Sequence, residues 1–173
     1  MLDDDHPLLA QHSWHHLDEQ ALAALAQRLA AWLRADPSRA NLRLTLHGEL
    51  GAGKTTWTRH LLRALGVQGR IQSPTFALVE PYEVTLGATP VTVMHADLYR
   101  LSDPREWLDA GLAEPMDAPG LKLIEWPERA GRLLGTVDAA LHLQHDDEHH
   151  RHLTWHAYTA AGFAALQALQ SSR

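Results

Sequence analysis

Apolar residues recur at helical spacing early in the chain. Between Asp18 and Ala35, leucines and one tryptophan repeat every three or four residues, while arginines and a glutamine lie off that stripe. Asp18 has a side chain suited to a helix N-cap, and the turn residues of "ADPSRAN" are typical of a helix end. The pattern predicts one amphipathic helix over this range.

A strand, a glycine-rich segment and a second helix are expected next. In "LRLTLHG", Leu42, Leu44 and Leu46 alternate with polar residues, which is the pattern of a strand. Helical spacing returns from Lys54 to Leu65, and Gly66 is a natural stop. The order strand, loop, helix is what a phosphate-binding loop requires.

The remaining segments alternate between short strands and helices. We expect one hairpin from "FALVEPYEV" and "PVTVMHA", a strand at "LKLIEW", and a second hairpin from "TVDAALHLQ" and "RHLTWHAY". "DPREWLDAG", "PERAGRLL" and residues 159–170 are expected to be helical, and "EPMDAPG" a loop. With no internal repeat, this order predicts an α/β fold with a mixed sheet.

Composition sets the class of protein. A chain of 173 residues with 45% hydrophobic residues suits one packed domain, so we expect a single P-loop ATPase domain over residues 1–173, with residues 1–16 poorly ordered. No apolar run reaches the roughly 18 residues of a membrane span. The acidic start "MLDDDHPLLAQH" is unlike a signal peptide, and cysteine is absent, so we expect a cytoplasmic protein without disulfides. A net charge of −6 argues against a broad grip on nucleic acid.

The strongest motif is "GELGAGKT", which fits G-x-x-x-x-G-K-[ST] through Gly48, Gly53, Lys54 and Thr55. In such loops, backbone N–H groups hold the phosphates of ATP, the lysine reaches the β and γ phosphates, and the hydroxyl ligates Mg²⁺. The predicted fold is therefore a three-layer P-loop NTPase-like fold with a mixed central sheet. The predicted binding residues of this loop are Glu49, Leu50, Gly51, Ala52, Gly53, Lys54, Thr55 and Thr56.

A magnesium triphosphate site also needs an acid at the end of a neighbouring strand. Asp97 follows "VTVMHA", and Glu125 ends "LKLI". One would hold the metal and the other would position the attacking water, and the residues alone leave the assignment open. Either acid could instead be a helix cap or a surface ion pair.

Two further groups of polar residues allow more than one interpretation. Ser73 and Thr75 in "QSPTF" could sense a γ phosphate, although a simple turn with a local hydroxyl bond explains them as well. A metal site is conceivable in the histidine-rich hairpin, but a solvated loop is the better interpretation. The residues of this hairpin are His145, Asp146, Asp147, Glu148, His149, His150, His152 and His156.

Four segments together resemble the TsaE (YjeE) family. "GELGAGKTTWTRHLLRALG", "GRIQSPTFALVEPY", "MHADLYRL" and "LIEWPERAG" appear in that family's order and spacing, and "LDEQALAALAQRLA" is similar to its first helix. The resemblance implies an ATPase of bacterial tRNA modification. Such proteins act with TsaD and TsaB in making N6-threonylcarbamoyladenosine, and ATP hydrolysis resets the TsaD–TsaB complex, so tRNA would be met only through that complex.

The resemblance also assigns roles to individual residues. Lys54 would bind phosphates, Thr55 and Glu125 would ligate Mg²⁺, and Asp97 would position the water, so the implied catalytic residues are Lys54, Asp97 and Glu125. The residues that it places around the rest of the nucleotide are Ser73, Thr75, Trp126, Arg151, Asp18 and Glu19.

Three other functions compete with this interpretation. A small P-loop kinase would transfer the γ phosphate to a metabolite or nucleotide, but its arginine-rich lid is not evident in the sequence. A nucleotide-gated interaction module would bind ATP without turnover. A GTPase is disfavoured because no N-K-x-D segment is present.

Overall fold

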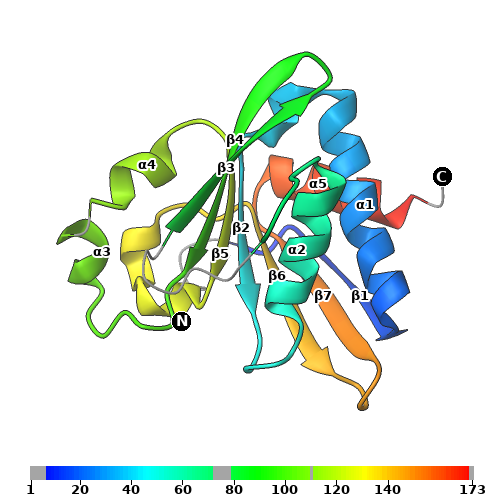
Figure 1. Ribbon diagram of the computed structural model, residues 1–173. Helices are drawn as coiled ribbons and strands as arrows, with labels where there is room; N and C mark the ends of the chain where they lie inside the picture. The colour runs from blue at the N-terminus through cyan, green and yellow to red at the C-terminus, as the bar shows by residue number, and fades with distance from the viewer. Residues whose placement is uncertain (1–6, 72–78, 110, 172–173) are drawn as a thin grey trace.

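A computed structural model describes residues 7–71, 79–109 and 111–171. One seven-stranded sheet crosses the molecule in the order β1-β7-β6-β2-β5-β4-β3 (Figure 1). Its strands are β1 (Ala10–Leu17), β2 (Leu42–His47), β3 (Val79–Leu86), β4 (Thr89–Asp97), β5 (Leu121–Glu125), β6 (Ala139–His145) and β7 (Arg151–Ala157).

The central strands run parallel and the outer ones antiparallel. β2 pairs in parallel with β5 and β6, and β4 pairs in parallel with β5. Both predicted hairpins are confirmed, as β3–β4 and β6–β7. Because β2, β4 and β5 end at the same edge of the sheet, their last residues lie together, and Asp97 is the register partner of Glu125. The sheet is mixed, as predicted.

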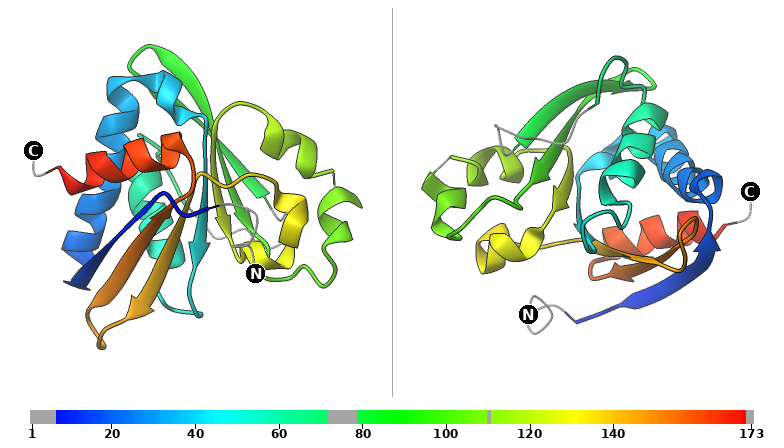
Figure 2. Two further views of the ribbon diagram at one scale, coloured as in Figure 1. Left: turned by 180° about the vertical axis from the view of Figure 1, so that it is seen from behind. Right: turned by 60° about the horizontal axis from the view of Figure 1, so that its bottom comes forward.

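Helices cover both faces of the sheet, which gives three layers (Figures 1 and 2). One face carries the long helices α1 (Glu19–Ala35), α2 (Lys54–Ala64) and α5 (Ala160–Gln170), packed on a leucine-rich core. The other carries shorter elements around a second core centred on Trp107. These elements are α3 (Arg105–Asp109), α4 (Ala113–Asp117), η2 (Pro127–Arg129) and η3 (Gly131–Leu134). A further 3₁₀ helix, η1 (Pro37–Ala40), follows α1. In the part of the chain that the structure describes, no helix is both long and apolar enough to cross a bilayer.

The prediction of a poorly ordered N-terminal segment is wrong from residue 10 onward. Ala10–Leu17 forms strand β1, which pairs with β7 along the edge of the sheet. The segment contains few aliphatic residues, but Trp14 packs against the main core and the Ser13 hydroxyl hydrogen-bonds that of Thr154 at 2.8 Å. Pairing to β7 therefore stabilises a strand whose own sequence is only weakly apolar.

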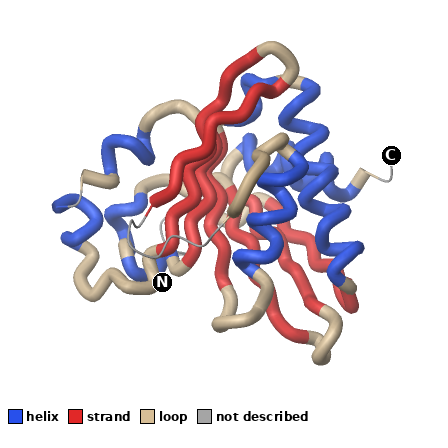
Figure 3. The backbone as a smooth tube through the Cα atoms, in the orientation of Figure 1, coloured by secondary structure: helices blue, strands red, loops and turns tan. Residues whose placement is uncertain are grey.

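Two local predictions on the second face also need correction. The segment "EPMDAPG", expected as a loop, provides most of helix α4, whose Met116 is buried in the second core. "PERAGRLL", expected as one helix, forms the separate 3₁₀ helices η2 and η3 (Figure 3). Gly131 lies at their junction with a φ of +57°, a left-handed conformation that interrupts a right-handed helix.

Candidate functional site

The glycine-rich loop joins β2 to α2 with its backbone in conformations that favour glycine. Gly48 has a φ of +146°, and a Cβ placed there would lie 2.5 Å from the carbonyl oxygen of Leu143. Gly53 is the residue before α2 and has a φ of +110°. These glycines allow the chain to turn tightly at the edge of the sheet, so the N-terminus of α2 opens onto the loop. Free N–H groups at such a terminus attract anions.

Lys54, the first residue of α2, is almost entirely buried in the loop. Its Nζ donates to the carbonyl oxygen of Gly48 at 2.5 Å and lies 3.6 Å from the centre of the Trp126 ring. Burial lowers the pKa of the Lys54 ammonium below its ordinary value, and the nearby charge of Glu125 opposes that shift. A negatively charged group beside Lys54 would stabilise its charged form.

Glu125 ends β5 beneath the loop, with only 2% of its surface exposed. Its Oε1 accepts a hydrogen bond of 3.1 Å from the Thr55 hydroxyl, and its Oε2 lies 2.6 Å from Nε2 of His95. With the ring proton on Nε2, His95 donates this hydrogen bond to the Glu125 carboxylate. His95 was not predicted from the sequence. The available signal was its place two residues before Asp97, on the same side of a predicted strand.

Asp97 ends the neighbouring strand β4, beside Glu125. Its Oδ1 accepts a hydrogen bond of 3.0 Å from the backbone N–H of Tyr99. Burial raises the pKa of the Asp97 carboxyl above its ordinary value, although that hydrogen bond acts in the opposite direction. The two acids therefore differ in surroundings: Glu125 has two side-chain partners, whereas Asp97 is held from the backbone.

Trp126 follows Glu125 in a left-handed backbone conformation with a φ of +56°. This conformation is uncommon for a residue with a large side chain. It directs the indole ring toward Lys54 on one side and toward Tyr99 on the other. The ring centres of Trp126 and Tyr99 are 5.0 Å apart. Strain of this kind persists where surrounding contacts determine it, and it concentrates at functional sites.

A cavity of about 450 Å³ opens above these residues. Most of the residues predicted from the sequence line it, namely Asp18, Glu19, Leu50, Gly51, Gly53, Lys54, Thr55, Thr56, Asp97, Glu125, Trp126 and Arg151. Four lining residues were not predicted as binding residues: Leu17, Leu22, Glu148 and His149. The cavity is large enough for a cofactor-sized ligand.

The other predicted residues lie elsewhere. Glu49 is exposed on the loop, and Ala52 is buried beneath it. The Ala52 carbonyl accepts a hydrogen bond of 3.1 Å from Nε of Arg151, so Ala52 ties the loop to strand β7. Ser73 and Thr75 fall outside the described residues.

The start of α1 and the β6–β7 hairpin also line the cavity. Asp18 caps α1, its Oδ1 accepting from the backbone N–H of Ala21 at 2.8 Å, as the sequence predicted. Oε1 of Glu19 lies 3.3 Å from Nε2 of His60 on α2. The start of α1 and the β6–β7 hairpin thus flank the glycine-rich loop, although neither is adjacent to it in the sequence.

The fold and the glycine-rich loop define an α/β protein of the P-loop NTPase-like class. The family model described as "Threonylcarbamoyl adenosine biosynthesis protein TsaE" matches residues 16–153. The chain belongs to the TsaE family, which confirms the resemblance noted in its sequence.

Individual relatives agree with this assignment. The chain is 34% identical over 131 residues to the tRNA threonylcarbamoyladenosine biosynthesis protein TsaE of Haemophilus influenzae, covering 76% of this chain and 80% of the relative. It is 35% identical over 118 residues to the TsaE protein of Bacillus subtilis, covering 68% of each. The crystal structure of Bacillus subtilis YdiB superposes with a TM-score of 0.72 at 25% identity, covering 92% of this chain and 94% of that one.

Proposed function

We propose that this chain is the ATPase of a bacterial tRNA N6-threonylcarbamoyladenosine machinery and hydrolyses ATP to cycle a TsaD–TsaB complex. The observation that carries the ATPase proposal is the hydrogen bond between Thr55 of the glycine-rich loop and the buried Glu125. It joins the phosphate loop to an acid on the neighbouring strand. Membership of the TsaE family supports the pathway.

The donor set at this point fits Mg²⁺. Thr55 and Glu125 offer a hydroxyl and a carboxylate oxygen, the hard ligands that Mg²⁺ prefers. We infer that these two residues hold the ion, which offsets charge on the phosphates when bound. The Thr55 hydroxyl donates its proton to Glu125, and a hydroxyl oxygen can ligate a cation while it donates.

The other residues of the cavity have distinct tasks in the proposed reaction. The backbone N–H groups of the loop and the Lys54 ammonium bind the phosphates and stabilise the charge that develops on them. Asp97 accepts a hydrogen bond from the attacking water and orients it in line with the γ phosphate. Burial raises the pKa of the Asp97 carboxyl, a direction that makes it a stronger hydrogen-bond acceptor.

Hydrolysis is favoured over phosphate transfer to a second substrate. Kinases surround the transferred group with several cationic side chains. Among the described residues that line the cavity, Arg151 is the single arginine, and it donates to backbone carbonyls of Ala52 and His150. We therefore expect slow hydrolysis by the chain alone and acceleration by its partners.

The test is ATP turnover by the purified chain, alone and with the cognate TsaD–TsaB pair. Strong stimulation that disappears in Glu125→Ala, but survives in Glu114→Ala, is the expected result. Glu114 is a matched control because it is an exposed acid on α4, which packs on the opposite face of the sheet. Unstimulated turnover would refute the partner role, and a phosphorylated small-molecule product would show a kinase instead.

A further inference from the structure

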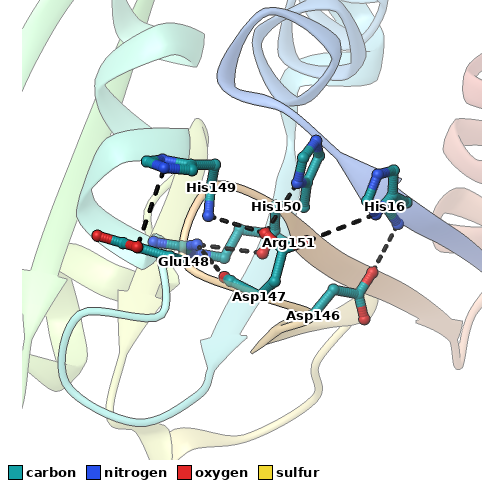
Figure 4. Close-up of polar contacts among 7 residues, drawn as sticks. All are labelled: His16, Asp146, Asp147, Glu148, His149, His150 and Arg151. Carbon is teal, nitrogen blue, oxygen red and sulfur yellow. Dashed lines mark hydrogen bonds and ion pairs between the residues drawn. The ribbon is translucent and has the colours of Figure 1, made fainter.

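Three side chains with metal-binding groups meet where β1 ends beside the β6–β7 hairpin. His16 belongs to β1, and Asp147 and His150 belong to the hairpin. One potential ligand atom from each lies within 4.8 Å of the other two. Figure 4 shows these side chains gathered between the two segments. The sequence predicts a solvated loop here, since these residues fall in a hairpin turn and on the polar face of a strand, and it does not place His16 next to them.

The Asp147 carboxylate lies beside both histidines. Asp147 Oδ1 is 2.8 Å from Nδ1 of His150, and its Oδ2 is 3.9 Å from Nδ1 of His16. The two imidazole rings stack at a centroid distance of 3.6 Å with an interplanar angle of 11°. Each carboxylate oxygen therefore faces one ring nitrogen, in a cluster small enough to surround a single ion.

The backbone of β1 is bent to place His16 in this cluster. The β1–β7 register shifts between Trp14 and Leu17, and His16 has a φ of +55°, which is uncommon for a residue with a side chain. Its backbone N–H donates to Oδ2 of Asp146 at 2.6 Å. Irregularities of this kind in a strand re-aim a side chain, here toward the hairpin.

We propose that His16, Asp147 and His150 bind a divalent transition-metal ion of the zinc class. Two imidazoles and one carboxylate form a donor set that suits Zn²⁺, and they leave a coordination position for water. This donor set differs from the all-oxygen pair of Thr55 and Glu125, so the two sites select different ions. Because parallel rings do not aim their lone pairs at one point, the rings must turn to bind. The His16 side chain is 67% exposed and has room to do so.

An ion at this position would fix one side of the cavity. Between the ligands Asp147 and His150 lie Glu148 and His149, which both line it. The next residue, Arg151, donates to the Ala52 carbonyl of the glycine-rich loop at 3.1 Å. Holding this segment in place lowers the cost of ordering it when a ligand binds. We therefore expect Zn²⁺ to tighten nucleotide binding, a consequence that rests on the proposed function.

The first experiment is calorimetric titration of Zn²⁺ into the full chain without a polyhistidine tag. One equivalent should bind, and His16→Gln and His150→Gln should each weaken binding by at least about tenfold. His145→Gln is the matched control, because His145 is an exposed histidine of the same hairpin outside the cluster. It should leave the affinity unchanged. Circular dichroism establishes that each variant is folded.

Two results would overturn the site: no saturable binding of Zn²⁺ by the unchanged chain, or equal affinities in the unchanged chain and both cluster variants. The second experiment measures the affinity for a fluorescent ATP analogue with and without Zn²⁺. Zn²⁺ also binds free nucleotide, so the unchanged chain is compared with His150→Gln at the same free Zn²⁺ concentration. Tighter binding in the unchanged chain alone supports the coupling.

The outcomes of the second experiment separate the two proposals. Equal effects of Zn²⁺ on both proteins would overturn the coupling while leaving the metal site in place. A chain that binds Zn²⁺ at this cluster but binds no nucleotide at all would contradict the proposed ATPase and leave the metal site supported.

Discussion

The buried contact between His95 and Glu125 makes the sharpest prediction about the site. His95 has no exposed surface, and its Nε2 lies 2.6 Å from Glu125 Oε2. The substitution His95→Leu fills the space with an apolar side chain but removes the hydrogen bond to a buried carboxylate. His95→Gln is the matched control, because the glutamine amide can donate from nearly the same place as Nε2.

The expected loss of stability follows from the chemistry of the pair. A hydrogen bond to a charged group contributes about 1.5–3 kcal/mol, and a buried carboxylate that loses a partner is not rescued by water. Glu125 keeps its second partner, Thr55, so the loss should stay within that range rather than reach the larger cost of an isolated buried charge. For a domain of this size, the melting temperature should fall by about 3–12 °C. His95→Gln should lose less.

The assay is urea unfolding of the unchanged chain, His95→Leu, Glu125→Gln and the double variant. If the hydrogen bond to the charged carboxylate is the cause, His95→Leu should cost less free energy of unfolding when Glu125 is already neutral. Side chains in direct contact typically couple by about 0.5–3 kcal/mol in such cycles. An equal cost of His95→Leu in both backgrounds would refute the reasoning and leave a packing role alone.

Three further predictions concern the loop and its surroundings. Gly48→Ala should weaken nucleotide binding by at least about tenfold, because its Cβ would lie 2.5 Å from a backbone oxygen. The Cβ of Gly51→Ala meets nothing within 4 Å, so this variant should lose less affinity, and equal losses of affinity would contradict the reasoning. Burial raises the folded-state pKa of Asp97, so stability is lost as pH rises from the ordinary aspartate value through the folded one. Asp97→Asn should therefore be more stable than the unchanged chain at about pH 7 but not at about pH 3 in urea unfolding, and an advantage at both would contradict it. Trp126→Leu should lower the free energy of unfolding by about 0.5–2 kcal/mol through the lost contact with Lys54, and Trp126→Phe, which keeps a ring, should lose less in the same assay.

Much of the fold could be predicted because its signals are local. Alternation predicted β2, helical spacing predicted α1 and α2, and Asp18 predicted the start of the first helix. Strand β1 could not be predicted in this way, since its stability comes from pairing with β7, more than a hundred residues away. The same reason applies to α4, where the burial of Met116 rather than helix propensity determines the structure.

The candidate site likewise contains residues that local sequence patterns predict and residues that only tertiary contacts bring into place. Residues of the glycine-rich loop are recognisable because their chemistry requires fixed spacing, and the acids at strand ends follow from parallel topology. His95 and His16 have no such pattern. The role of His95 depends on which carboxylate lies opposite it, and the position of His16 depends on an irregularity in β1. Both are set by tertiary contacts that one sequence does not reveal.

The arrangement of cations in the cavity also bears on where the rate of the proposed hydrolysis would be controlled. Lys54 has three donors, and one of them binds the Gly48 carbonyl, so the others can reach phosphates without moving the side chain away. Arg151 is different, because its guanidinium donates to the carbonyls of Ala52, Asp147 and His150. Reaching a γ phosphate would require it to give up these bonds and loosen the hairpin. Lys54 can therefore bind phosphates in the ground state. The described residues that line the cavity include no mobile cation for the transition state. We therefore expect this group to come from a partner protein, which would make hydrolysis depend on assembly.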